Sequence, residues 1–92
     1  MTEITSPHNH IVKEVRSLKT SKGRQEKGLF FIEGTRIFEE ALKSEEKIKY
    51  AVVSDSFVKS PSFDKTIGDY VKTLKIYVVP DRLFRDMADT DT

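Results

Sequence analysis

The chain has 92 residues, of which 37% are hydrophobic and 34% are charged, and its net charge is +1. This length allows one compact domain and is too short for a second core. Because cysteine is absent, disulfides and thiolate metal sites are excluded, which is compatible with a reducing compartment, and we expect a cytoplasmic protein. The longest apolar runs, residues 29–32 and 76–79, are too short to cross a membrane.

The charge is unevenly distributed along the chain. Residues 13–27 contain six Lys or Arg against two Glu, a net charge of +4, whereas residues 28–92 carry a net charge of −2. A basic face that binds nucleic acid leaves such an asymmetry in a sequence. The alternative is an exposed helix whose charges are simply solvated.

The first predicted element is a helix near the N-terminus. Ser6 is expected to cap it, with Pro7 in its first position, where a missing N–H costs nothing. Gly23 and Gly28 are expected to break the chain that follows. One apolar stripe of this helix is expected to face the sheet, and it consists of Ile11, Val15 and Leu18.

The apolar run at residues 29–32 predicts a strand that is covered on both faces. Gly34 and Thr35 are expected to end this strand and to start a second helix. The residues of this second helix that should point inward are Ile37, Phe38, Ala41 and Leu42.

Two further strands are predicted at residues 48–53 and 76–79. Between them, five apolar residues at helical spacing indicate a third helix: Phe63, Ile67, Tyr70, Val71 and Leu74. Pro80 and Asp81 then lead into a short fourth helix that carries Leu83, Phe84 and Met87.

This order of elements predicts an α/β fold, a three-layer α/β/α sandwich with a mostly parallel central sheet. Because all three predicted strands are nearly continuous apolar runs, most of the following should be buried: Phe30, Ile32, Val52, Val53, Val78 and Val79.

Motifs that carry chemistry are mostly missing. The sequence has no dinucleotide-binding or phosphate-binding glycine loop, and His8 and His10 have no obvious third ligand, so we expect no metal. Glu33 stands at the predicted end of a strand, before Gly34, where α/β folds place functional groups. It either acts there or has a structural role, for example by orienting an arginine.

Several of these residues form an ordered pattern: Ile4-x-Ser6-x-x-Asn9-x-x-Val12-Lys13, Leu18, Lys22, Arg24, Phe30-x-Ile32-Glu33-Gly34-x-Arg36 and Glu40-Ala41-Leu42. The pattern resembles the N-terminal substrate-binding domain of the SpoU/TrmH-type RNA ribose 2′-O-methyltransferases. The match is dense over residues 4–42 and rests only on the alternation of strands and helices over residues 48–79. The motif that opens the family's catalytic domain is not present.

The resemblance implies a fold like that of ribosomal proteins that bind kinked RNA. Residues 1–88 are then the RNA substrate-binding domain, and residues 89–92 begin a linker to a C-terminal catalytic domain that is absent here. In the family, that domain binds S-adenosylmethionine and usually forms a homodimer. The fragment is therefore expected to contain no catalytic, cofactor-binding or metal-binding residue. No association with a membrane is expected. An rRNA or tRNA substrate is expected.

The expected RNA-binding residues combine the basic stretch with the family pattern: Asn9, Lys13, Lys19, Lys22, Arg24, Lys27 and Arg36. Glu33 and Gly34 are expected to be orienting or structural residues, and helix capping is an equally good role for Asn9. Two other classes remain open. One is a free-standing RNA-binding protein of the ribosomal type. The other is a protein-interaction module that exposes the apolar stripe of its first helix.

Overall fold

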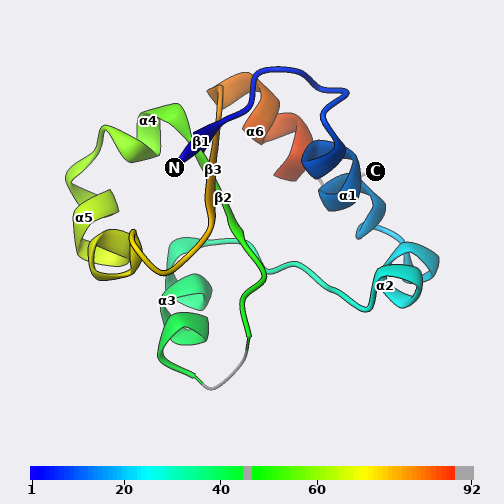
Figure 1. Ribbon diagram of the computed structural model, residues 1–92, viewed down its shortest axis with the longest axis horizontal. Coiled ribbons are helices and arrows are strands. Elements are labelled where there is room, and N and C mark those ends of the chain that lie inside the picture. Colours follow the sequence, from blue (N-terminus) through cyan, green and yellow to red (C-terminus); the bar gives the residue numbers. More distant parts are fainter. Residues whose placement is uncertain (45–46, 89–92) are drawn as a thin grey trace.

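The computed structural model describes residues 1–44 and 47–88. Figure 1 shows a short sheet with helices around it. In chain order the elements are β1 (Thr2–Glu3), α1 (His10–Ser17), α2 (Ser21–Lys27), α3 (Thr35–Lys43), β2 (Ala51–Ser54), α4 (Asp55–Val58), α5 (Pro61–Ile67), a 3₁₀ helix η1 (Gly68–Tyr70), β3 (Ile76–Val79) and α6 (Asp81–Ala88).

The sheet has three parallel strands in the order β1-β3-β2. In its register Ala51 lies beside Ile76 and Ser54 beside Val79, so β2 and β3 are paired over their full length. All four residues of the central strand β3 are buried. The strand β1 has only two residues, too few to show a periodicity, and the sequence did not reveal it.

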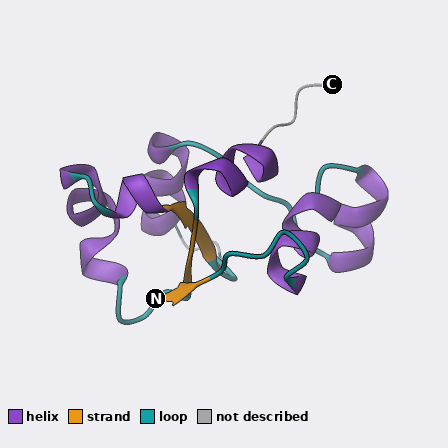
Figure 2. Cartoon of the chain, turned by 90° about the horizontal axis from the view of Figure 1, so that it is seen from above, coloured by secondary structure: helices purple, strands orange, loops and turns teal. Residues whose placement is uncertain are grey.

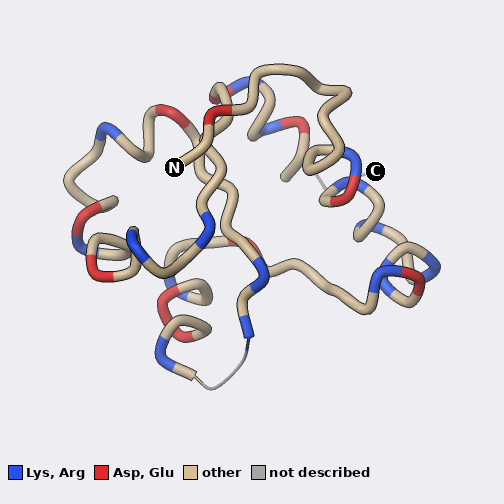
Figure 3. Tube along the Cα trace, in the orientation of Figure 1, with Lys and Arg blue, Asp and Glu red and all other residues tan. Residues whose placement is uncertain are grey.

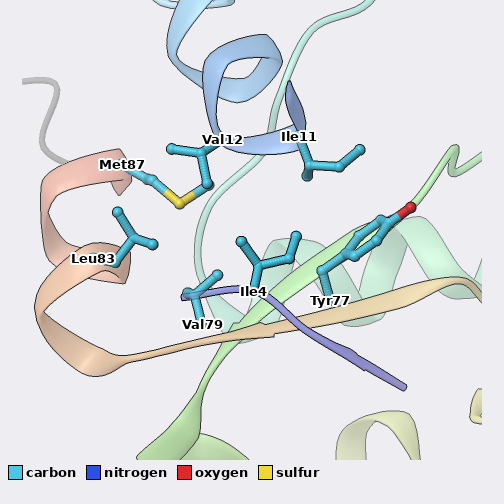
Figure 4. Close-up of a cluster of buried hydrophobic side chains, with 7 residues drawn as sticks. All are labelled: Ile4, Ile11, Val12, Tyr77, Val79, Leu83 and Met87. Carbon is cyan, nitrogen blue, oxygen red and sulfur yellow. The ribbon is translucent and has the colours of Figure 1, made fainter. Parts of the chain in front are cut away.

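One face of the sheet is covered by α1 and α6. Figure 4 shows their side chains meeting those of β3 in a cluster formed by Ile4, Ile11, Val12, Tyr77, Val79, Leu83 and Met87. Each large apolar side chain buried in this way contributes about 1.5–3 kcal/mol. Because Ile11 and Leu18 are buried, the apolar stripe of α1 faces the core of its own domain and is not presented to a partner protein.

The other face of the sheet packs against α5, and side chains of α3 and α4 contact the same cluster. The alternate residues of β3, Ile76 and Val78, point to this side and join Ala51, Val53, Phe63 and Ile67. Phe38 of α3 and Phe57 of α4 pack against this cluster. The rings of Phe57 and Phe63 meet edge to face at 5.9 Å, a favourable geometry for aromatic pairs. Figure 2 shows helices on both sides of the strands, which confirms the α/β sandwich.

The first helix begins later than the sequence predicted. Its cap is Asn9, whose side-chain oxygen accepts the backbone N–H of Ile11 at 2.8 Å. The Ser6 hydroxyl instead accepts the N–H of His8 in the turn before the helix. The expected break at Gly23 is also wrong, because Gly23 lies inside α2. Gly28 does end that helix, in the left-handed conformation with φ 65°.

The predicted strand at residues 29–32 is not formed, and this is the largest correction. The segment is irregular and joins α2 to α3, and no strand pairs with it in the described part of the chain. Phe30 is therefore 71% exposed and Ile32 39% exposed, whereas Val53, Val78 and Val79 are buried as expected and Val52 is half-buried. Ile37, expected inside, is 50% exposed because its side of α3 faces the same open region.

The remaining differences concern the bounds of elements. The strand β2 begins at Ala51, after the predicted start at residue 48, and the third helix ends at Ile67 before the separate turn η1. The strand β3 and the helix α6 are confirmed. None of the helices in residues 1–44 and 47–88 has the length and apolar composition that crossing a membrane requires. The expected linker at residues 89–92 lies outside the described residues.

Candidate nucleic-acid interface

The basic stretch folds as two short helices, α1 and α2, joined by a tight turn. Figure 1 shows α2 at the outer edge of the molecule, beyond α1 and away from the sheet. Thr20 caps α2 by accepting the N–H of Gly23 at 3.0 Å. A Cβ on Gly23 would lie 1.8 Å from the backbone oxygen of Ser17. Only glycine at this position therefore allows α2 to turn back so closely on the end of α1.

Arg24 fixes this turn from its other side. Its guanidinium donates to the backbone oxygen of Leu18 at 2.9 Å and to the hydroxyl of Ser21 at 3.2 Å. The first bond ties α2 to Leu18, the residue that ends α1, and the second lies within α2 and orients the guanidinium. Since a guanidinium carries more N–H donors than these bonds use, Arg24 is held in place and still has donors for a ligand.

Glu14 connects three parts of the chain. Its carboxylate accepts the hydroxyl of Tyr50 at 2.7 Å and lies 3.4 Å from the ammonium of Lys49 and 3.9 Å from that of Lys27. The hydrogen bond from Tyr50 lowers the pKa of Glu14 against the opposing effect of burial, and the two lysines lower it further. Burial and the bond to Glu14 raise the pKa of Tyr50. Glu14 thus holds α1, the end of α2 and the approach to β2 together.

The cations around this unit are largely at the surface. Lys13 and Lys22 are exposed, and Lys22 pairs only loosely with Glu26, at 4.0 Å. Lys19 donates to the backbone oxygen of Asp86 at 3.3 Å, which connects the turn to α6. An exposed ion pair such as Lys22–Glu26 contributes little free energy, so it competes only weakly with a phosphate for the lysine. Figure 3 shows Lys and Arg positions recurring along α2.

The structure brings together most of the predicted RNA-binding residues but not all of them. Lys13, Lys19, Lys22, Arg24 and Lys27 belong to the α1–α2 unit, whereas Arg36 is exposed at the start of α3. Asn9 has a structural role as a helix cap.

Glu33 is exposed and forms no ion pair with either arginine in the described part of the chain. Gly34 has a φ of 109°, which only glycine adopts readily. Among the described residues, no group of His, Asp and Glu is arranged to hold a metal ion.

Lys49 and Lys75 extend the basic surface in a way that the sequence reasoning missed. They lie at the amino ends of β2 and β3, with ammonium groups 6.0 Å and 5.9 Å from the rings of Tyr50 and Tyr77. The available signal was a lysine one or two residues before a strand with a tyrosine one or two residues after that lysine: Lys49 and Tyr50 precede β2, and Lys75 precedes β3, whose second residue is Tyr77. Through Glu14, Lys49 is placed beside Lys27 of α2, so the basic surface runs from the helices to the edge of the sheet.

The fold is a small parallel α/β domain whose first two helices, α1 and α2, carry a concentration of basic residues. The chain belongs to the family of MRM3-like substrate binding domains, whose model matches residues 9–92. It is 33% identical over its whole length to the 23S rRNA (guanosine(2553)-2′-O)-methyltransferase RlmP of Bacillus subtilis strain 168. The chain spans 34% of the length of that relative. No solved structure matches the chain.

Proposed function

We propose that this chain is the RNA substrate-binding domain of an S-adenosylmethionine-dependent RNA ribose 2′-O-methyltransferase that acts on rRNA or tRNA. The observation that carries the proposal is the α1–α2 unit, which carries Lys13, Lys22 and Lys27 together with an arginine, Arg24, that the fold holds in place. Membership of a substrate-binding family and the similarity to an rRNA methyltransferase support it.

The chemistry of this surface fits the backbone of RNA. Each lysine that neutralises a phosphate releases a counterion, and each such contact to single-stranded RNA adds about 0.7 to the slope of log affinity against log salt. Arg24 contributes more than its charge, because its planar fork holds a phosphate in two bonds or stacks on an exposed base. Lys49, placed beside Lys27 by Glu14, extends the path of the phosphates toward the sheet.

Within a full-length enzyme, residues 1–88 bind the RNA and residues 89–92 begin the linker to a C-terminal catalytic domain. That domain supplies the site for S-adenosylmethionine and the contacts of a homodimer, and the fragment contributes no cofactor contact of its own. The enzyme works in the cytoplasm, where its substrate is made. The similarity to an rRNA methyltransferase supports this arrangement.

The test uses the full-length enzyme and its own RNA at physiological salt. Changing Lys19, Lys22 and Arg24 together to Ala is expected to weaken RNA binding at least about ten-fold and to leave the affinity for S-adenosylmethionine intact. Because Arg24 also bonds within the protein, a second variant with Lys13→Glu and Lys22→Glu changes only exposed side chains.

The matched control removes three exposed cations from the opposite layer of the domain: Lys59→Ala, Lys65→Ala and Lys72→Ala. This control should change RNA affinity by less than about two-fold. If both α1–α2 variants bind RNA as tightly as the natural protein, the RNA surface lies elsewhere. Tight, specific RNA binding by the 92-residue chain alone would instead favour a free-standing RNA-binding protein.

A further inference from the structure

Two acidic residues, Glu14 and Glu26, interrupt the basic stretch, and their surroundings differ. Glu26 is exposed and lies 4.0 Å from the ammonium of Lys22. The side chain of Glu14 is only 15% exposed and lies between Lys27 of α2 and Lys49 before β2. Among the described residues, Glu14 is the one carboxylate that pairs with two lysines. Because a carboxylate repels phosphates, the charge of Glu14 by itself opposes the binding of RNA.

The core of the domain fixes the position of this carboxylate. Tyr50 donates its hydroxyl to Oε1 of Glu14 at 2.7 Å. The ring of Tyr50 packs edge to face on Tyr77 of the buried strand β3, with 5.5 Å between the ring centres. The helix that carries Glu14 is anchored by Ile11, which is buried in the same cluster as Tyr77 (Figure 4). Both ends of the Glu14 side chain are therefore held by the fold.

Each oxygen of the fixed carboxylate holds one lysine. Oε1 lies 3.4 Å from the ammonium of Lys49, and Oε2 lies 3.9 Å from that of Lys27. The two ammonium groups therefore lie within about 10 Å of each other, a distance over which salt screens their charges only partly. Phosphates recur every few ångströms along a nucleic-acid strand, so the two lysines are close enough to bind neighbouring phosphates.

The two lysines remain open to a ligand while they are held. The side chain of Lys27 is 47% exposed and that of Lys49 is 57% exposed. An ammonium has three donors, so the contact with Glu14 leaves donors on each lysine for a phosphate. A free lysine side chain loses rotamer freedom when it binds a phosphate. Because Glu14 restricts both side chains beforehand, less entropy is lost when RNA binds.

We propose that Glu14 is a positioning residue that strengthens RNA binding although it is negatively charged, because it holds Lys27 and Lys49 as one pair for neighbouring phosphates of the RNA backbone. This inference rests on the proposed function, since it takes the α1–α2 unit as part of the RNA surface. It places the backbone of the RNA across the junction between the end of α2 and the start of β2. Glu26, which holds no such pair, only repels the RNA.

The same substitution at the two acidic residues tests the proposal. Glu14→Gln and Glu26→Gln each remove one negative charge from the basic stretch and keep the shape of the side chain. The readout is the affinity of the full-length enzyme for a fluorescent single-stranded oligouridylate at physiological salt. Glu26→Gln should leave this affinity unchanged or raise it up to about three-fold. Glu14→Gln should lower it at least about three-fold, because both lysines are released. A smaller loss or a gain for Glu14→Gln overturns the proposal.

Tyr50→Phe is the second variant and decides the matter if Glu14→Gln does not fold. It keeps every charge and the ring that packs on Tyr77, and it removes only the hydroxyl that fixes the carboxylate. It should lower RNA affinity at least about two-fold, because Lys27 and Lys49 then follow a mobile carboxylate. An affinity equal to that of the natural protein counts against the proposal.

A double-mutant cycle on the two lysines separates positioning from a merely structural role of Glu14. Lys27→Ala and Lys49→Ala are measured singly and together for the same RNA, in the natural protein and with Glu14→Gln. In the natural protein the second loss should be at least about three-fold smaller than the first, because the lysines act as a pair. With Glu14→Gln the two losses should multiply within about two-fold. Independent losses in the natural protein contradict the pairing.

Failure of the proposed function has a different signature. If the RNA surface lies elsewhere, the combined change of Lys19, Lys22 and Arg24 to Ala leaves the affinity for the same probe unchanged. If only the role of Glu14 is wrong, that combined change still weakens binding at least about ten-fold, and Glu14→Gln behaves like Glu26→Gln.

Discussion

The carboxylate of Glu14 is expected to be the strongest polar contact that fixes the basic helices to the sheet. The change Glu14→Ala removes the acceptor of the Tyr50 hydroxyl and the partner of both Lys49 and Lys27. It leaves the half-buried hydroxyl of Tyr50 without its acceptor, and a buried donor that loses its partner is costly.

The structure sets the size of the effect. A hydrogen bond to a charged group contributes about 1.5–3 kcal/mol, and the bond from Tyr50 is short at 2.7 Å, with a Glu14 side chain that is 15% exposed. The two lysines are about half exposed, and each adds at most about 1 kcal/mol. We therefore expect Glu14→Ala to lower the free energy of unfolding by about 2–3 kcal/mol, and Tyr50→Phe to lower it by about 1–2 kcal/mol.

Urea unfolding of the two single variants and of the double variant gives the coupling energy between Glu14 and Tyr50. It should be at least about 1 kcal/mol at neutral pH. The pKa of Glu14 is lower in the folded protein than its ordinary value of 4.5. The contribution of the Glu14 carboxylate to stability is therefore complete above pH 4.5 and is lost as the pH falls through the folded pKa. The coupling energy with Tyr50 should accordingly decrease in acid.

The exposed pair of Lys22 and Glu26, four residues apart on α2, is the matched control. The same cycle on this pair should give less than about 0.5 kcal/mol at every pH. A coupling between Glu14 and Tyr50 as small as that of the control pair would refute the reasoning. A coupling that did not change between neutral pH and pH about 3 would also refute it, because the carboxylate charge would then have no part in it.

Two further predictions concern packing. Gly23→Ala should destabilise the domain by about 1–3 kcal/mol in urea unfolding, because the added Cβ collides with the Ser17 backbone; a gain in stability, as alanine gives in an open helix, would show that α2 can move away from α1. Met87→Ala should lower the free energy of unfolding by about 2–5 kcal/mol in the same assay, because the Met87 side chain of α6 is only 3% exposed and is packed in the cluster that includes Ile11 and Val12 of α1. A loss below about 1 kcal/mol would mean that α6 is not anchored there.

Some features of this fold follow from local sequence. The run Ile76–Val79 and the pattern of Leu83 and Met87 predict β3 and α6, because each pattern is strong enough to specify its element without help from the rest of the chain. The concentration of cations in residues 13–27 likewise indicated the basic surface. The start of α1 was missed because two caps, Ser6 and Asn9, were both plausible, and only the packed helix selects one.

The sequence by itself determined the class of fold, the position of the buried central strand and the basic character of the first helices. Only the tertiary structure decided which of those cations share a surface. Glu14 places Lys27 beside Lys49, 22 residues later in the chain, and leaves Arg36 apart on α3. The same holds for residues 29–32, whose composition favours a strand. A strand exists only when a neighbour supplies the hydrogen bonds, and that pairing depends on contacts between distant residues.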